Sequence, residues 1–404
     1  MNQEQIDELR DLIDYERKRT APPRDFPKLP DLPGKRYTDE EFFSLEKEHL
    51  WKQSWLLAGH LEEIKEIGSY KLWDKAGQPI IIVRKSKREV TAFYNMCRHR
   101  GAAIVLDEFG RSNKLVCGYH GWTYDHDGNL IGKRDPKDFI DFDDSCRSLH
   151  KVKVELLGNL IFVNFNLEVY HVKSIHPQTV QTGLDYTGNV NTFYPNGHGR
   201  MVAPSRTYPD LPEVALKANP DAFVVKDENA MPSNYYKNES FRVEDNRPEI
   251  ETCGYIARTC TQSYNLVPNL VSPMSEKGFP ILLWWPTSID QCIFEVYWVA
   301  PHWGKGKRPE IWDIAIEGFN KVLDEDLHFG SWIQKAVDSY VFDGVPLSYQ
   351  EARIYHWHQQ IDKIIGLNRI PKDLRVEPKI TEEWTHPNDN KKRLEEYNKF
   401  IKTG

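Results

Sequence analysis

The chain has 404 residues, 28% charged and 40% hydrophobic, so it is long enough to bury one large core or two smaller ones. Its 53 basic and 60 acidic residues give a formal charge of -7, which argues against a nucleic-acid or anionic-membrane partner. No apolar run reaches the ~18 residues that a bilayer span needs, and the first 19 residues lack a signal-peptide core. These features predict a cytoplasmic protein that binds small molecules or other proteins.

Two helices are expected near the N-terminus. Residues 1–19 place apolar side chains at helical spacing among charged ones, and the prolines from Pro22 onward end that pattern. A second helix should begin at Thr38 or Asp39, either of which can cap it, and should run to about Trp51.

From residue 69 to 165 the pattern changes to short β-rich runs separated by turn signals, which predicts a small all-β domain. The expected strands are 70–73, 79–84, 90–95, 114–117, 122–124, 152–156 and 159–165.

Beyond residue 166 the chain mixes helices and strands, so the second domain should be α+β. We expect strands at 280–286 and 292–299 and one long helix from Pro309 to about Tyr340. The charged, proline-rich tail after Asn368 has a helix candidate at 391–401 and is expected to be peripheral.

Four potential metal ligands stand in two groups, Cys97-Arg-His99 and, after seventeen residues, Cys117-Gly-Tyr-His120. Two thiolates and two imidazoles can hold a [2Fe-2S] cluster, with the cysteines on one iron and the histidines on the other. A zinc site is the alternative, but zinc fingers usually pair cysteine with cysteine and histidine with histidine around a helix. Here each pair is mixed and the surroundings are strands, which favours iron-sulfur and a reducing compartment.

The stretches Cys97-Arg-His-Arg-Gly-Ala102 and Cys117-Gly-Tyr-His-Gly-Trp-Thr-Tyr124 resemble the Rieske domain of ring-hydroxylating oxygenase α (large) subunits. The resemblance implies an all-β Rieske domain followed by an α+β catalytic domain, in which a curved antiparallel sheet and helices hold a mononuclear Fe(II). It implies four parts of the chain: a helical arm at 1–50 that packs on the catalytic domain, the Rieske domain at 51–165, the catalytic domain at 166–366 and a charged tail at 367–404.

Candidate ligands of the second iron follow. His171 and His176 are about 140° apart on an ideal helix, so Pro177 must turn His176 back from the helix end toward a metal bound by His171. A facial triad also needs one carboxylate. Asp326 lies about 60° from Leu323 on the apolar face formed by Ile316, Phe319, Leu323 and Leu327, whereas Glu325 lies about 160° away. The resemblance favours Asp326 too, because family members carry an acid pair here whose second member binds iron.

Glu168 precedes His171 by three residues. The resemblance implies that it bridges the two metal centres between neighbouring subunits, a position where the family usually has aspartate and where some members that act on quaternary amines have glutamate. The plainer alternative is an exposed acid near a helix N-terminus. Family members place several dozen residues between the last Rieske strand and the histidine helix, whereas here Phe165 is followed almost directly by Glu168. The sequence leaves open whether this junction is native or a segment is missing.

The resemblance implies the terminal oxygenase of a multi-component system. It takes electrons from NAD(P)H through a partner reductase or ferredoxin and uses O2 to hydroxylate a small organic substrate. The expected substrate is an aromatic or apolar ring, which would place the protein in aromatic hydrocarbon catabolism. A head-to-tail homotrimer, with or without a β subunit, is expected, as is an aromatic pocket lined by strands 279–285 and 292–299. The alternatives are a quaternary-amine or N/O-demethylating monooxygenase, an electron-transfer protein without catalytic iron, and a zinc-binding interaction module. Whether one or both oxygen atoms enter is left open.

Overall fold

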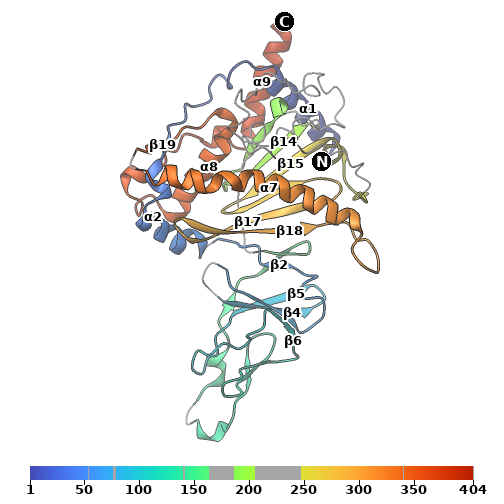
Figure 1. Ribbon diagram of the computed structural model, residues 1–404, viewed down its shortest axis with the longest axis vertical. Coiled ribbons are helices and arrows are strands. Elements are labelled where there is room, and N and C mark those ends of the chain that lie inside the picture. The colour runs from blue at the N-terminus through green and yellow to red at the C-terminus, as the bar shows by residue number, and fades with distance from the viewer. Residues whose placement is uncertain are drawn as a thin grey trace. The chain divides into compact units, whose positions relative to one another are not determined.

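In the computed structural model the chain forms two compact units (Figure 1). One unit contains Trp51–Asn164, and the other combines Met1–Leu50 with Phe165–Gly404. The structure describes residues 1–52, 54–75, 79–139, 142–162, 186–204, 247–339 and 341–403. In these ranges no helix is both long enough and apolar enough to cross a membrane.

The described residues of the smaller unit form three antiparallel sheets, with strand orders β10-β5-β4-β3-β6, β11-β12-β2 and β7-β8-β9. Every run that we expected to be a strand contains one, so the prediction of an all-β domain is confirmed. Short strands β2, β6 and β9 were not predicted. The strands are β2 (Gly59–His60), β3 (Ser69–Trp73), β4 (Ile80–Ser86), β5 (Glu89–Tyr94), β6 (Phe109–Arg111), β7 (Leu115–Val116), β8 (Thr123–Tyr124), β9 (Leu130–Gly132), β10 (Lys151–Val152), β11 (Glu155–Leu157) and β12 (Leu160–Phe162).

The larger unit contains a six-stranded antiparallel sheet whose strands follow one another in chain order. The expected hairpin is present, because Ile281 pairs with Tyr297 and Trp284 with Phe294 across its two strands. The strands are β13 (Val190–Phe193), β14 (Gly199–Pro204), β15 (Cys260–Leu266), β16 (Leu270–Met274), β17 (Phe279–Ser288) and β18 (Gln291–Val299). A separate two-stranded pairing joins β1 (Leu32–Pro33) to β19 (Gly344–Val345).

Helices accompany this sheet, which confirms the expected α+β class. They are α1 (Gln3–Lys18), α2 (Glu40–Leu45), the π-helix η2 (Glu46–Trp51), α6 (Tyr255–Thr259), α7 (Glu310–Val337), α8 (Ala352–Ile365) and α9 (Asn388–Thr403). Short 3-10 helices lie at η1 (Gly34–Tyr37), η3 (Pro136–Asp138), η4 (Asp144–Arg147), η5 (Tyr186–Gly188), η8 (Tyr349–Glu351), η9 (Lys372–Leu374) and η10 (Glu382–Trp384).

The two faces of the sheet are covered by different helices. On β13, Val190 packs with α1 while Phe193 packs with α8, and the odd spacing of these residues puts their side chains on opposite faces. On the outer strand β18, the ring of Trp298 contacts Phe319 of α7, with ring centroids 5.4 Å apart. Paired residues of neighbouring strands point to the same face, and following the pairing from β13 to β18 puts Phe193 and Trp298 on one face of the sheet. Helices α7 and α8 therefore share this face, and α1 lies on the other.

Both N-terminal helices form where the sequence predicts them. The side chain of Asp39 accepts a hydrogen bond from the backbone N–H of Phe42 at 2.7 Å, so Asp39 is the cap of α2. The helical path then continues as the π-helix to Trp51, close to the predicted end.

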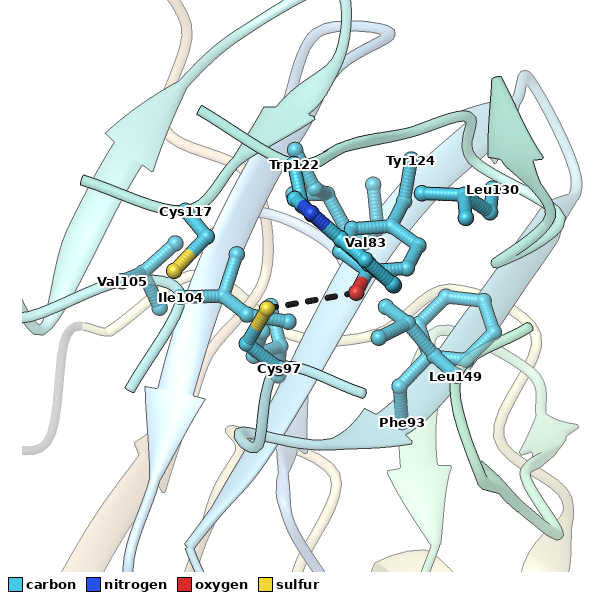
Figure 2. Packing of buried hydrophobic residues seen from close by; sticks show 12 residues of the cluster. Val83, Phe93, Cys97, Ile104, Val105, Cys117, Trp122, Tyr124, Leu130 and Leu149 are labelled. Atoms are coloured by element: carbon cyan, nitrogen blue, oxygen red, sulfur yellow. Dashed lines mark hydrogen bonds between the residues drawn. The ribbon is translucent and has the colours of Figure 1, made fainter. Parts of the chain in front are cut away.

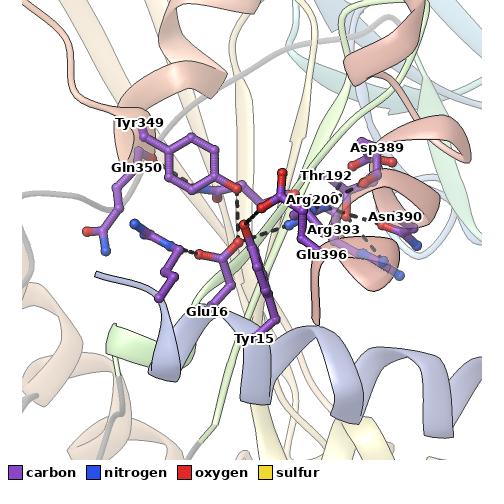
Figure 3. A network of polar contacts seen from close by, with 12 residues as sticks. Tyr15, Glu16, Thr192, Arg200, Tyr349, Gln350, Asp389, Asn390, Arg393 and Glu396 are labelled. Atoms are coloured by element: carbon purple, nitrogen blue, oxygen red, sulfur yellow. Dashed lines mark hydrogen bonds and ion pairs between the residues drawn. The ribbon is translucent and has the colours of Figure 1, made fainter. Parts of the chain in front are cut away.

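The C-terminal helix α9 is an integral part of the larger unit, so the expectation of a peripheral tail was wrong (Figure 3). Arg393 is fully enclosed and donates to Asp389 Oδ2 at 2.8 Å, to Glu16 Oε1 of α1 at 3.3 Å and to the backbone oxygen of Asn191 at 3.0 Å. Tyr349 also donates to Glu16 Oε1, at 2.9 Å. The charged residues of the tail led us to expect solvent exposure, but some of them are buried in ion pairs that join the two ends of the chain.

Candidate metal centres

Two loops of the smaller unit carry the cysteine and histidine motifs, and both have the same backbone structure. In the first, Cys97 N–H donates to Ala102 O at 2.8 Å and Gly101 N–H donates to Cys97 O at 2.9 Å. In the second, Cys117 N–H donates to Trp122 O at 2.8 Å and Gly121 N–H donates to Cys117 O at 2.9 Å. The repeated pattern places one cysteine at the base of each loop.

Each loop depends on a glycine. Gly101 has φ 76° and Gly121 has φ 72°, a left-handed backbone conformation that L side chains rarely adopt. A Cβ atom at either position would meet no atom within 4 Å. The backbone angle, rather than crowding, is therefore the reason for glycine at these two turns.

The loops bring the two histidines together. His99 Nδ1 and His120 Nδ1 are 3.1 Å apart. Two imidazole nitrogens that bind one metal at about 2.0–2.1 Å, at a near-tetrahedral angle, are separated by about 3.1–3.4 Å. Burial, followed by the charges of His120 and Arg100, lowers the pKa of His99, which favours the neutral imidazole that metals bind.

The two cysteines lie in the hydrophobic core beneath the loops (Figure 2). Tyr124 Oη accepts a hydrogen bond from the Arg98 N–H at 3.0 Å, so its own O–H can donate to Cys97 Sγ, 3.3 Å away. Burial raises the pKa of Cys97, and the adjacent Cys117 thiol raises it further. A metal that binds this sulfur must therefore displace its proton.

The four side chains form a sulfur pair and a nitrogen pair. Within the described ranges, no three His, Cys, Asp or Glu side chains surround a single point. A binuclear cluster needs only two protein ligands on each iron, so the donor set and its pairing fit a [2Fe-2S] cluster. The chain has six cysteines and all are free thiols.

Two aromatic residues of the motif have roles that the sequence analysis did not assign. The indole of Trp122 stacks on the His99 ring with centroids 4.9 Å apart and planes 9° from parallel, and Tyr124 contacts Cys97 as described above. Trp122 and Tyr124 follow His120 by two and four positions, respectively. Trp122 directly precedes β8 and Tyr124 lies in it, so the alternation of side chains in an extended chain was the available signal.

The residues expected at the second iron are divided between described and undescribed parts of the chain. Glu168, His171 and His176, with the junction after Phe165, lie outside the described residues. Asp326 lies in the middle of α7 and is partly buried, whereas Asp324 is exposed. Of the expected triad, only Asp326 lies within the described residues.

The rotation of α7 separates these two aspartates. Phe319 faces the sheet through its contact with Trp298. At 100° per residue, Asp326 is about 20° from Phe319 around the helix and Asp324 is about 140° from it. Asp326 therefore shares the sheet-facing side of α7. Leu327, which we expected on the apolar face, is 55% exposed, because it is about 80° from Phe319.

The predicted aromatic lining is divided between the two faces of the β17–β18 hairpin, so it cannot form one wall. Trp284, Phe294 and Trp298 point toward the face of α7, and the Trp284 and Phe294 rings lie 4.8 Å apart. Phe279, Trp285 and Tyr297 point to the opposite face by the same pairing. Trp285 also donates to Glu295 Oε2 at 2.9 Å, a contact that belongs to this second face.

Comparisons with known families match both parts of the chain. Residues 54–143 match the Rieske [2Fe-2S] domain, and residues 146–367 match the ring hydroxylating alpha subunit (catalytic domain). The second match covers more than half of the chain.

Curated relatives align over a shorter stretch. Benzene 1,2-dioxygenase subunit alpha of Pseudomonas putida is 37% identical over 131 residues, 32% of this chain and 29% of that protein. The carnitine monooxygenase oxygenase subunit of Escherichia coli is 32% identical over 135 residues, 33% of this chain and 36% of that protein. The chain thus matches only about a third of the length of these relatives.

Solved structures resemble the chain over most of its length. A quaternary ammonium Rieske monooxygenase gives a TM-score of 0.61 at 18% identity, covering 84% of this chain and 100% of that one. Naphthalene 1,2-dioxygenase with indole bound gives a TM-score of 0.53 at 15% identity, and the match covers 86% of this chain and 97% of that one. At these identities the likeness concerns the fold. With the paired ligand loops and the two family matches, it follows that the chain belongs to the family of Rieske ring-hydroxylating oxygenase alpha subunits, which carry a [2Fe-2S] cluster and a mononuclear iron.

Proposed function

We propose that this chain is the terminal oxygenase of a Rieske non-haem iron system. The observation that carries the proposal is the pair of matching loops, which place two cysteines together and two histidine nitrogens 3.1 Å apart in a chain whose residues 146–367 match the catalytic family. When bound, the cluster supplies one-electron transfer and the mononuclear iron supplies dioxygen activation.

The ligand assignment is part of this proposal. Cys97 and Cys117 bind one iron of the cluster, and His99 and His120 bind the other. Tyr124 donates to Cys97 Sγ, and Trp122 covers the ring of His99. These neighbours orient the ligands.

For the mononuclear iron we propose His171, His176 and Asp326. Support comes from the rotation of α7, which directs Asp326 toward the sheet and Asp324 away from it. Two histidines and one carboxylate leave positions open for O2 and substrate. We further propose that Glu168 links the two centres between neighbouring subunits of a head-to-tail homotrimer, with a ferredoxin or reductase as the source of NAD(P)H-derived electrons.

An aromatic or apolar ring is the first substrate candidate. Trp284, Phe294 and Trp298 share the α7-facing side of the hairpin, and aromatic side chains of this kind suit an apolar ligand. Benzene 1,2-dioxygenase among the relatives is consistent with such a substrate.

A quaternary amine is the second candidate. Glutamate at position 168 favours it, as do the carnitine and glycine betaine monooxygenases among the relatives. The same three aromatic side chains could bind a trimethylammonium group through cation–π contacts. The two candidates thus share one side of the hairpin and differ in the charge of the ligand.

Iron content and product analysis test the proposal together. Asp326→Ala should lose the mononuclear iron and more than about 100-fold of the product formation rate, while the cluster absorbance stays. Asp324→Ala is the matched control on the same helix and should keep the mononuclear iron and the wild-type rate of product formation. Substrate turnover is measured with reductase, NAD(P)H and O2 against arenes, aromatic acids and trimethylammonium compounds.

The outcomes discriminate among the alternatives. Product from trimethylammonium compounds alone would replace the aromatic candidate with the quaternary-amine one. A protein with the cluster but without a third iron would be an electron carrier. A colourless protein that contains zinc and no acid-labile sulfide would refute the cluster assignment.

A further inference from the structure

A lysine lies almost buried beside the proposed cluster site. The Lys133 side chain is only 7% exposed and ion-pairs with Asp144, whose side chain is 51% exposed. Its Nζ lies 4.3 Å from the centre of the Phe142 ring and 5.3 Å from that of Phe139. A buried ammonium group is costly unless it is paired, and aromatic faces stabilise it further; Lys133 has both kinds of partner.

The same two phenylalanines connect Lys133 to a proposed ligand. Phe139 and Phe142 meet edge to face with centroids 5.1 Å apart, and they pack edge to face on Trp122 at 5.9 and 5.7 Å. Trp122 in turn stacks on His99. We call Lys133, Phe139, Phe142 and Trp122 the aromatic clasp.

The clasp separates the ammonium group from the His99 ring by aromatic carbon rather than by water. Charge interactions are weakly screened through such a medium. Asp144 opposes the field of Lys133 but is half exposed to solvent, which screens it. Arg147 lies over the same Phe142 ring at 5.2 Å and is exposed, so its field is screened as well.

We propose that Lys133 is a positioning residue of the cluster, whose charge, held by the aromatic clasp at the histidine side, raises the reduction potential of the [2Fe-2S] centre. This inference rests on the ligand assignment made under the proposed function. Reduction adds one electron from an external donor and makes the cluster more negative, and a nearby cation stabilises that state. The clasp also holds Trp122 against one face of the His99 ring, which fixes the orientation of that ring.

The two charges of the clasp predict shifts of opposite sign. Lys133→Met keeps much of the side-chain volume and removes the charge, so the potential should fall. Asp144→Asn removes the opposing charge and should raise the potential. Lys133→Arg retains the charge and should restore the wild-type value. A matched control is Lys85→Met, which breaks a more exposed lysine–carboxylate pair with Asp127 in the same unit and should leave the potential unchanged.

Redox titration of the holoprotein with dithionite, followed by visible circular dichroism and by EPR of the reduced state, measures these shifts. A wild-type potential in Lys133→Met, or no upward shift in Asp144→Asn, overturns the inference. If Lys133→Met does not retain the cluster, the reduction potential of Asp144→Asn alone tests the inference. Absence of a Rieske EPR signal in the wild-type protein would instead refute the proposed function, so the two failures are distinguishable.

Discussion

Glu46 shows how one residue can make the stability of this fold depend on pH. It is the first residue of the π-helix that follows α2, and burial raises its pKa to about 7, an effect that Asp362 increases and Arg36 opposes. The folded protein therefore holds a proton on Glu46 at pH values where the unfolded chain has released it. The resulting stability is complete below about pH 4.5 and is lost as the pH rises through 7.

We predict that Glu46→Gln is more stable than wild type at pH 8 by about 1–3 kcal/mol and nearly equal to it at pH 5, because glutamine stays neutral throughout. Urea unfolding at the two pH values measures the difference. Glu41→Gln, at an exposed position of α2, is the control and should show no such dependence. An equal effect of Glu46→Gln at both pH values would contradict the explanation.

At the scale of elements, α9 joins the two ends of the chain through Arg393. Its guanidinium group donates to Glu16 of α1 and Asp389 of α9 (Figure 3), and also to the backbone oxygen of Asn191 in β13. Burying a single partner without the others would leave an uncompensated charge in the core. The helix is thus tied to α1 by mutual charge compensation.

Arg393→Met should destabilise the protein by about 3–5 kcal/mol, since the buried carboxylate of Asp389 loses its ion-pair partner and that of Glu16 keeps only Arg19. Lys391→Met, an exposed neighbour on the same helix, should change stability by less than about 0.5 kcal/mol. Denaturant midpoints of the two variants measure the contrast. Similar losses in both would indicate that the helix as a whole, rather than the ion network, is responsible.

At the scale of the whole molecule, the proposed ligands of the two iron centres belong to different compact units. Cys97, His99, Cys117 and His120 lie in Trp51–Asn164, and Asp326 lies in the unit that contains α7. Each group of ligands is therefore held by the packing of its own unit. A substitution that removes a ligand of one metal centre should leave the other centre in place.

We predict that Cys117→Ser retains about one iron per chain and Asp326→Ala retains about two, against about three in the wild type. Elemental analysis together with visible spectra checks both variants. Loss of all the iron from either variant would show that the two centres depend on each other.

The sequence alone determined the features that depend on residues near one another in the chain. Alternation located β3 to β5, helical periodicity located α1 and α7, and the spacing of the four cysteines and histidines indicated the cluster motif. It also favoured Asp326 over Glu325, because rotation around a helix follows from residue number. The expected residues His171 and His176 stay predictions.

The tertiary structure decided what depends on distant partners. Strand register divided the aromatic side chains between two faces, and long-range packing buried Arg393 in a helix whose composition is typical of an exposed tail. The clasp around Lys133 likewise needs Trp122 and Phe142, which lie on separate segments. The physical reason is that charge and exposure are set by the groups a residue meets after folding, and local sequence patterns do not contain that information.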